Sequence, residues 1–262
     1  MAFNHFRNIT IITSTVIAAC DPRKGTLNMK KLIQRTSLLA MMAGSALLTG
    51  CGGDAYTAEE LLTMYPDISA TSTKAEEKEI LCPFQRMLKR SGILDDAIEE
   101  GSFEVKNRTL TEAAEVFGCN SGACGAAVGY ASLAQGNWST LDMDRLHEAG
   151  FLSHDCGLQF ELGGVTVSDT RRAATLSRLS ELAVDGRLDF NDLMTVKNET
   201  CAQEGVEITI GGETEVKLIY AYLGGPDRDY IEYSDVEKFL HATMPDYKAA
   251  GFIDINLIGE VQ

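Results

Sequence analysis

The chain has 262 residues, of which 45% are hydrophobic, enough for one large domain or two small ones. Its formal net charge is −15 at pH 7, so we expect an acidic surface that disfavours nucleic acids and anionic membranes as partners. These properties still allow both an enzyme and a binding protein for a small neutral molecule.

The N-terminal region has the layout of an export signal. From Met29 to Cys51 the chain runs from basic residues through an apolar stretch to Leu-Thr-Gly-Cys. The apolar stretch is too short for a membrane span, and its ending resembles a bacterial lipobox. We therefore expect residues 1–50 to be an upstream extension plus a lipoprotein signal peptide, with lipid attached to Cys51. The expected location is the periplasmic side of the outer membrane; the alternative is an ordinary cleaved signal.

The next segment, residues 51–75, is expected to be a tether followed by the first helix. Thr57 and Glu60 have the spacing of a capping box, which predicts a helix at about 58–65. No repeat or interdomain linker follows this segment. The remainder, residues 76–262, is therefore expected to form a single domain.

A cysteine stands directly before a proline at the start of the second predicted helix. Pro83 suits the first helical position, and Phe84, Met87 and Leu88 share one apolar stripe. Cys82 is then the cap, where free N–H groups and the helix dipole favour a thiolate. Such a thiolate suits a nucleophile, a redox thiol or a ligand of a soft metal centre. A buried structural cysteine is the alternative.

Helical patterns continue along the rest of the chain. The first of them is expected to start at Thr109, because Thr109 and Glu112 match another capping box. Residues 206–212 fit a short strand or an extended loop. We expect a mostly α single domain, with helices at about 109–117, 121–135, 139–153, 168–184, 189–197, 213–224 and 233–245.

Export changes what is expected of the cysteines. Five follow the lipid-attachment site, an odd number in an oxidising compartment. Cys119 and Cys124 are close enough in sequence to close a local disulfide. Cys156 and Cys201 would form a second one. Cys82 is then the cysteine without a partner.

Four segments in order resemble the haem-thiolate peroxidases, the chloroperoxidase and unspecific peroxygenase family. The first is CPFQRMLKRSGIL at 82–94, which resembles the family's proximal Cys-Pro helix and the Gly-x-Leu after it. The second resembles the family's Glu-His-Asp segment, the third its glutamate-bearing distal helix and the fourth its closing segment. These three are LDMDRLHEAGFLSHD at 141–155, GGETEVKLIYAYLGG at 211–225 and YSDVEKFLHATMPDYKAAGF at 233–252.

The resemblance implies a chloroperoxidase-like helical domain around haem b. It makes Cys82 the axial ligand of the haem iron. It places Pro83, Phe84 and Met87 beside the cofactor.

The resemblance also implies a distal acid–base, with Glu213 as the first choice and Glu215 as the second. His154 and Asp155 would orient that carboxylate. The family's divalent cation, magnesium or manganese, is doubtful. Ser153 and Gly157 stand where two of its oxygen ligands are expected.

An enzyme of this family would use hydrogen peroxide to oxidise, oxygenate or halogenate a small organic substrate. The chain would then be an oxidoreductase, either a peroxidase or a peroxygenase. The alternative is a catalytically decayed envelope lipoprotein that binds a small molecule or a partner. A third possibility, a calcium-linked surface module, depends on residues 185–193, which match half of an EF-hand loop.

Overall fold

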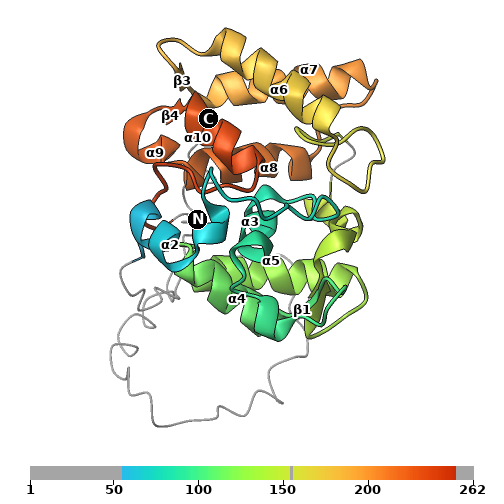
Figure 1. The fold of residues 1–262 in the computed structure, drawn as a ribbon. Helices are drawn as coiled ribbons and strands as arrows, with labels where there is room; N and C mark the ends of the chain where they lie inside the picture. The colour runs from blue at the N-terminus through green and yellow to red at the C-terminus, as the bar shows by residue number, and fades with distance from the viewer. Residues whose placement is uncertain (1–54, 154–155, 252–262) are drawn as a thin grey trace, which may run out of the picture. The chain divides into compact units, whose positions relative to one another are not determined.

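The computed structural model describes residues 55–153 and 156–251. All of them belong to the second of two compact units of the chain, residues 44–262. This part is mostly helical, with two short two-stranded sheets, so the predicted mostly α class is confirmed (Figure 1). The predicted signal peptide and Cys51 lie outside the described residues.

The two N-terminal helices begin where local sequence signals place them. Helix α2 (Ala58–Met64) has the predicted capping box, with both the Thr57 and the Glu60 side chains bonded to backbone N–H groups. A 3-10 turn (Pro66–Ile68) follows. Helix α3 (Pro83–Ser91) starts directly after Cys82 and ends at Gly92, whose φ of 82° is left-handed.

Helix α4 (Asn107–Val116) starts two residues before its predicted position. Its cap is Lys106, and the expected Thr109–Glu112 capping box is absent. Strand β1 (Glu104–Lys106) feeds directly into the helix, so Thr109 already lies inside it. The Glu112 carboxylate instead accepts a 2.7 Å hydrogen bond from Arg108.

The segment at 139–153 begins with a strand and continues as two short 3-10 helices, so the predicted short helix starts later than expected and is not an α-helix. Strand β2 (Thr140–Asp142) pairs antiparallel with β1. The Gln135 amide accepts from the N–H of Asp142 and donates to the carbonyls of Asp142 and Arg145, which satisfies the backbone of this segment without an α-helix. The 3-10 turns cover Met143–Glu148 and Gly150–Leu152.

Two long helices follow in the second described range, residues 156–251. Helix α6 (Asp169–Leu182) is capped by Ser168, and α7 (Phe190–Gln203) extends six residues beyond its predicted end. Asp189 and Asp192 form the capping box of α7, so two of the three carboxylates in the half-matched EF-hand loop already accept backbone hydrogen bonds. Among the described residues no group of three or more metal-binding side chains is found.

Three helices and one sheet complete the fold. Residues 206–209 form a loop, and α8 (Ile210–Tyr222) starts within the segment taken for a strand or loop. Helices α9 (Gly225–Arg228) and α10 (Tyr233–Leu240) follow. Strand β3 (Arg187–Leu188), which precedes α7, pairs antiparallel with strand β4 (Ile231–Glu232), which connects α9 to α10.

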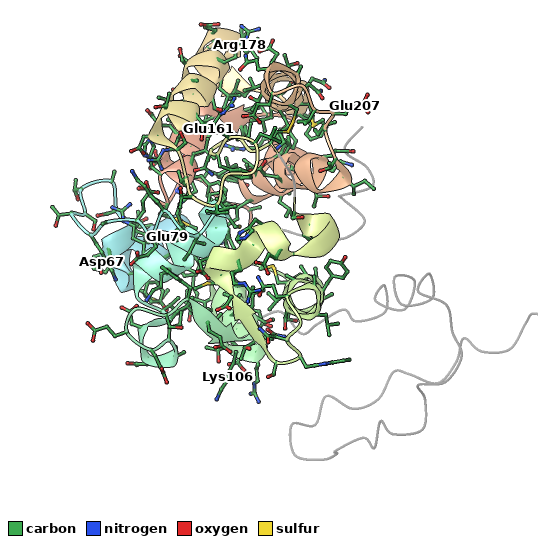
Figure 2. All side chains as sticks on the ribbon, turned by 90° about the vertical axis from the view of Figure 1, so that its right-hand side faces the viewer. Asp67, Glu79, Lys106, Glu161, Arg178 and Glu207 are labelled. Atoms are coloured by element: carbon green, nitrogen blue, oxygen red, sulfur yellow. A yellow bond between two sulfur atoms is a disulfide. The ribbon has the colours of Figure 1, made fainter. Side chains whose placement is uncertain are left out.

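Helix α3 lies at the centre of the described unit. In Figure 1, α4 and α5 (Ser121–Ala134) lie on one side of it and α8 and α10 on the other, with α6 and α7 beyond α8. The labelled side chains of Lys106, Arg178 and Glu207 lie at the periphery (Figure 2). None of the helices in the described ranges has the length and apolar character to cross a membrane.

Candidate functional site

An apolar cavity lies beside the N-terminus of α3. Its walls come from α3, α4, α5, the 3-10 turns and α8. The centres of water-sized molecules can occupy about 220 Å³ of it, so it has room for a ligand much larger than water. Its apolar side chains are those of Leu81, Pro83, Phe84, Leu88, Leu110, Ala114, Ala127, Val128, Ala131, Leu146, Ala149, Leu152, Phe160, Leu218, Ile219, Tyr222 and Phe239.

Cys82 lies in the wall of this cavity with a free thiol. It is the one free cysteine of the described residues. The backbone N–H groups of Gln85 and Phe84, at this helix N-terminus, lower the pKa of its thiol, although the Cys82 side chain makes no capping hydrogen bond. Burial nevertheless raises the pKa of the Cys82 thiol above its usual value, and these N–H groups offset only part of that effect. The prediction that this helix cap favours the thiolate over the thiol is therefore wrong, because burial outweighs the cap.

The structure places three of the four predicted haem-contacting residues at the cavity. Cys82, Pro83 and Phe84 line it, whereas Met87 does not. Met87 is fully buried in the hydrophobic core, and Leu88, one turn after Phe84, takes the place on the wall. The wall is fixed by aromatic packing, because the Phe84 ring meets the Tyr222 ring edge-on at 5.4 Å.

Both predicted disulfides are present. Cys119 is bonded to Cys124 at the start of α5, and Cys124 also lines the cavity. Cys156 is bonded to Cys201, which ties the segment after residue 155 to α7. Cys82 is left unpaired, as the odd cysteine count predicts.

Glu215, rather than Glu213, reaches the cavity. Two residues along a helix turn a side chain by about 200°, so the two carboxylates cannot share one face. Glu213 is not in the cavity wall: 46% of its side-chain surface is exposed, and it pairs with Lys217 at 2.8 Å. Glu215 lines the cavity and only 10% of its side-chain surface is exposed. The structure thus places the second choice of the sequence analysis, Glu215, at the cavity and the first choice, Glu213, away from it.

A buried lysine that the sequence analysis did not single out binds Glu215. The Nζ atom of Lys197 lies 2.6 Å from Oε2 of Glu215, and the Lys197 side chain has no exposed surface. The signal was present in the sequence, because Lys197 lies one turn from both Leu193 and Cys201 on the buried face of α7. A lone lysine among buried positions of a helix indicates an ion-paired partner in the interior.

Packing accounts for Ser153 and Gly157, the two positions at which the resemblance leads one to expect oxygen ligands of a cation. Ser153 lines the cavity, but its hydroxyl donates a 2.6 Å hydrogen bond to the carbonyl of Gly150. A Cβ atom on Gly157 would lie 2.2 Å from the Phe160 ring, so no side chain fits there. His154 and Asp155, the predicted orienting pair, lie outside the described residues. His147 is the described histidine in the cavity wall.

Glu215 and Cys82 line the same cavity, which gives a test in the protein without cofactor. The Glu215 charge contributes to the raised pKa of the Cys82 thiol. Glu215→Gln should therefore increase the thiolate fraction at neutral pH and speed alkylation of Cys82 by iodoacetamide several-fold. The rate is followed by mass spectrometry of the Cys82 peptide.

The matched control is Glu213→Gln, which changes the same residue type on the same helix away from the cavity. We expect its Cys82 alkylation rate to equal that of the parent. Equal acceleration in both variants, or none in Glu215→Gln, would contradict the placement of Glu215 beside the thiol.

Comparison with known proteins adds no assignment to this geometry. No protein-family model matches the chain, and no curated protein sequence matches it either.

Proposed function

We propose that the chain is a haem-thiolate oxidoreductase that uses hydrogen peroxide on a small organic substrate. One observation carries the proposal: the free cysteine of the described residues caps a helix in the wall of an apolar cavity, and a glutamate from another helix lines the same cavity. These residues fit haem b in two respects, a sulfur donor for iron and apolar walls for a flat macrocycle.

Cys82 would hold the iron. Its thiol is protonated at neutral pH because burial raises its pKa, so it would release its proton when the metal binds. The N–H groups of Gln85 and Phe84 would then stabilise the sulfur charge. When bound, a haem with a thiolate ligand supplies an electron-rich iron that favours cleavage of the O–O bond.

Glu215 would serve as the acid–base group of the cavity. Its carboxylate lines the wall, so it could take a proton from the incoming peroxide and return it to the departing oxygen. Lys197 compensates its negative charge at Oε2. His147, on another wall, is a second group able to carry a proton.

The substrate proposed for this site is a small apolar organic molecule. The cavity wall offers mainly aliphatic and aromatic carbon, and its described polar groups are few. A charged substrate would lose its hydration without gaining partners. We further propose that the protein acts at the cell envelope, anchored through lipid on Cys51; a divalent cation stays outside the proposal because of Ser153 and Gly157.

The proposal is tested by adding haem to the purified protein. The parent should bind haem and give the reduced carbon monoxide spectrum of thiolate ligation. Cys82→Ala should lose that spectrum and most of the bound haem, because the iron loses its protein ligand. Met87→Leu, next to the cavity wall but in the core, is the control and should keep the parent spectrum.

A second candidate is a haem-free binder of apolar molecules. It is favoured by the raised pKa of the Cys82 thiol, which keeps the sulfur a poor ligand in the absence of metal. This binder would be supported, and the enzyme rejected, if the folded parent protein took up no haem but bound an apolar fluorescent probe. The Leu218→Trp variant, which fills part of the cavity wall, should then bind the probe more weakly.

A further inference from the structure

An exposed tryptophan stands just after helix α5. Trp138 is the single tryptophan of the chain, and 86% of its surface is exposed. The residues on both sides of it are fixed by backbone hydrogen bonds. The N–H of Asn137 donates to the carbonyl of Ser132 at 2.9 Å, and the carbonyl of Ser139 accepts from the N–H of Asn107 at 2.8 Å. Because tryptophan is highly buried on average, a ring held outward in this way indicates contact with another apolar phase or molecule.

The chain that leads to Trp138 carries no charge. Between Glu115 and Asp142 the sequence contains no charged residue, although charged residues make up 23% of the chain. Helix α5 lies wholly in this stretch, and its exposed positions include Ser121, Ala126, Leu133 and Ala134. The net charge of −15 disfavours contact of the remaining surface with anionic lipid headgroups, whereas this neutral face can approach them without repulsion.

The expected lipid anchor would join the chain close to this helix. Cys51 lies outside the described residues, but it precedes Ala55, where the described range begins, by only four positions. Four extended residues span at most about 14 Å. The Cβ of Ala55 lies 3.7 Å from the place of a Cβ atom on Gly118, shortly before α5 begins. A lipid on Cys51 would therefore hold this end of α5 close to the bilayer.

Exposed aromatic side chains flank both ends of α5. Tyr56, the neighbour of Ala55, is 43% exposed at the end where the anchor would be, and Trp138 follows the other end. The 14 residues of α5 make a helix about 21 Å long. Tyrosine and tryptophan rings favour the headgroup level of a bilayer, and stable attachment combines a lipid with a second contact. Helix α5 is thus suited to lie along the bilayer surface.

We propose that Trp138 and the exposed face of α5 dock on the lipid bilayer to which Cys51 anchors the chain. The docking rests on the lipid attachment proposed above, and not on haem. On its inner side, α5 contributes Cys124, Val128 and Ala131 to the wall of the apolar cavity. Docking places that cavity one helix away from the bilayer. If the haem-thiolate function holds, its substrates are then small apolar molecules that dissolve in lipid.

The fluorescence of Trp138 tests the docking. The processed chain is purified from bacterial membranes without added haem, mass spectrometry verifies the lipid on Cys51, and the protein is inserted into phosphatidylethanolamine–phosphatidylglycerol vesicles. The emission reports one side chain, because the chain has a single tryptophan. We expect emission at a shorter wavelength than for a solvent-exposed tryptophan, quenching by lipids with brominated acyl chains, and protection from acrylamide in the water.

A tryptophan moved to another face is the control for position. Val184 is 73% exposed and follows α6, which lies on the other side of α3 from α5 (Figure 1). In the double variant Trp138→Phe, Val184→Trp, we expect quenching by acrylamide and none by brominated lipids. Equal quenching by brominated lipids at both positions would contradict docking through α5.

Two leucines of similar exposure test the face itself. Leu133 on α5 is 47% exposed, and Leu162, in the loop before α6, is 49% exposed. Leu133→Glu adds a charge to the docking face, so the emission of Trp138 should return to longer wavelength and its quenching by brominated lipids should fall. Leu162→Glu should leave both unchanged. No difference between these two variants would also contradict the proposal.

Three further outcomes would overturn the docking. One is a Trp138 that acrylamide still quenches fully in the lipidated, vesicle-bound protein. Another is protection from acrylamide without quenching by brominated lipids, which would mean that protein, such as residues 252–262, covers the ring. The third is a mature chain without lipid on Cys51. Haem binding is measured separately: docking without haem uptake rejects the haem-thiolate function alone, and thiolate-ligated haem with an exposed Trp138 rejects the docking alone.

Discussion

Replacement of Arg86 with methionine should lower the free energy of unfolding by about 3–5 kcal/mol, the usual cost of removing one partner from a buried ion pair. Arg86 has no exposed surface, and its Nε lies 3.1 Å from the Glu76 carboxylate. Burial lowers the pKa of Arg86 to about 10, so the side chain is still charged at neutral pH. The effect is measured by urea unfolding.

The loss goes beyond the ion pair, because Arg86 organises the backbone that leads to Cys82. Its guanidinium donates to the carbonyls of Ile80 at 2.9 Å, Leu81 at 3.2 Å and Leu240 at 2.9 Å. It also donates to the side-chain oxygen of Gln159. Methionine would remove the Arg86 donor from all of these acceptors, and of them the carbonyl of Leu240 keeps a hydrogen bond from Arg172 at 3.1 Å. Position 86 therefore couples the stability of the fold to the position of the cysteine.

Arg178→Met is the control for the Arg86 result. Arg178 also binds two carboxylates, those of Glu199 and Glu181, but at the surface, where solvent screens the attraction. We expect its stability to stay close to that of the parent. A similar loss of stability in both variants would show that the buried network around Arg86 contributes no more to the free energy of unfolding than the surface ion pairs of Arg178.

The disulfide between Cys156 and Cys201 should contribute more to the free energy of unfolding than the other described disulfide. It closes a loop with a sequence separation of 45, against 5 for Cys119–Cys124. The chain-entropy relation predicts that the double serine variant of the long loop loses about 4 kcal/mol and that of the short loop about 2 kcal/mol. Urea unfolding under oxidising conditions measures both.

The order of the two losses is the informative result. The Cys156–Cys201 variant should also weaken the hold on Lys197, because the carbonyl of Cys156 accepts the lysine's hydrogen bond. A short-loop variant that loses more stability than the long-loop variant would show that packing around α5, rather than loop entropy, dominates. Full stability in both variants would contradict a structural role for either bond.

The features that were predictable from the sequence are those that depend on residues within one helical turn of each other. The capping box of Thr57 and Glu60 and the Cys82–Pro83 helix start depend only on neighbouring residues, and both are present. The Thr109–Glu112 box has the same local pattern but does not form. Pairing of β1 with the distant strand β2 sets where the chain enters α4, and no local signal encodes that contact.

The choice between Glu213 and Glu215 could have been predicted from helical spacing. Glu215 lies one turn before Ile219 and two turns before Tyr222, both in the cavity wall, whereas Glu213 lies one turn before Lys217. Helical spacing alone thus favours Glu215. The partner of Glu215 was less accessible, since Lys197 is 18 residues away on another helix and meets it only when α7 packs on α8.

The close approach of Gly157 to Phe160 limits the order in which this loop can change during evolution. A serine at position 157, the residue expected from the resemblance, would place its Cβ 2.2 Å from the aromatic ring. A lineage with Phe160 can therefore reach that serine only after the ring has become smaller or moved away. The Gly157→Ser substitution by itself would therefore force the Phe160 ring to shift.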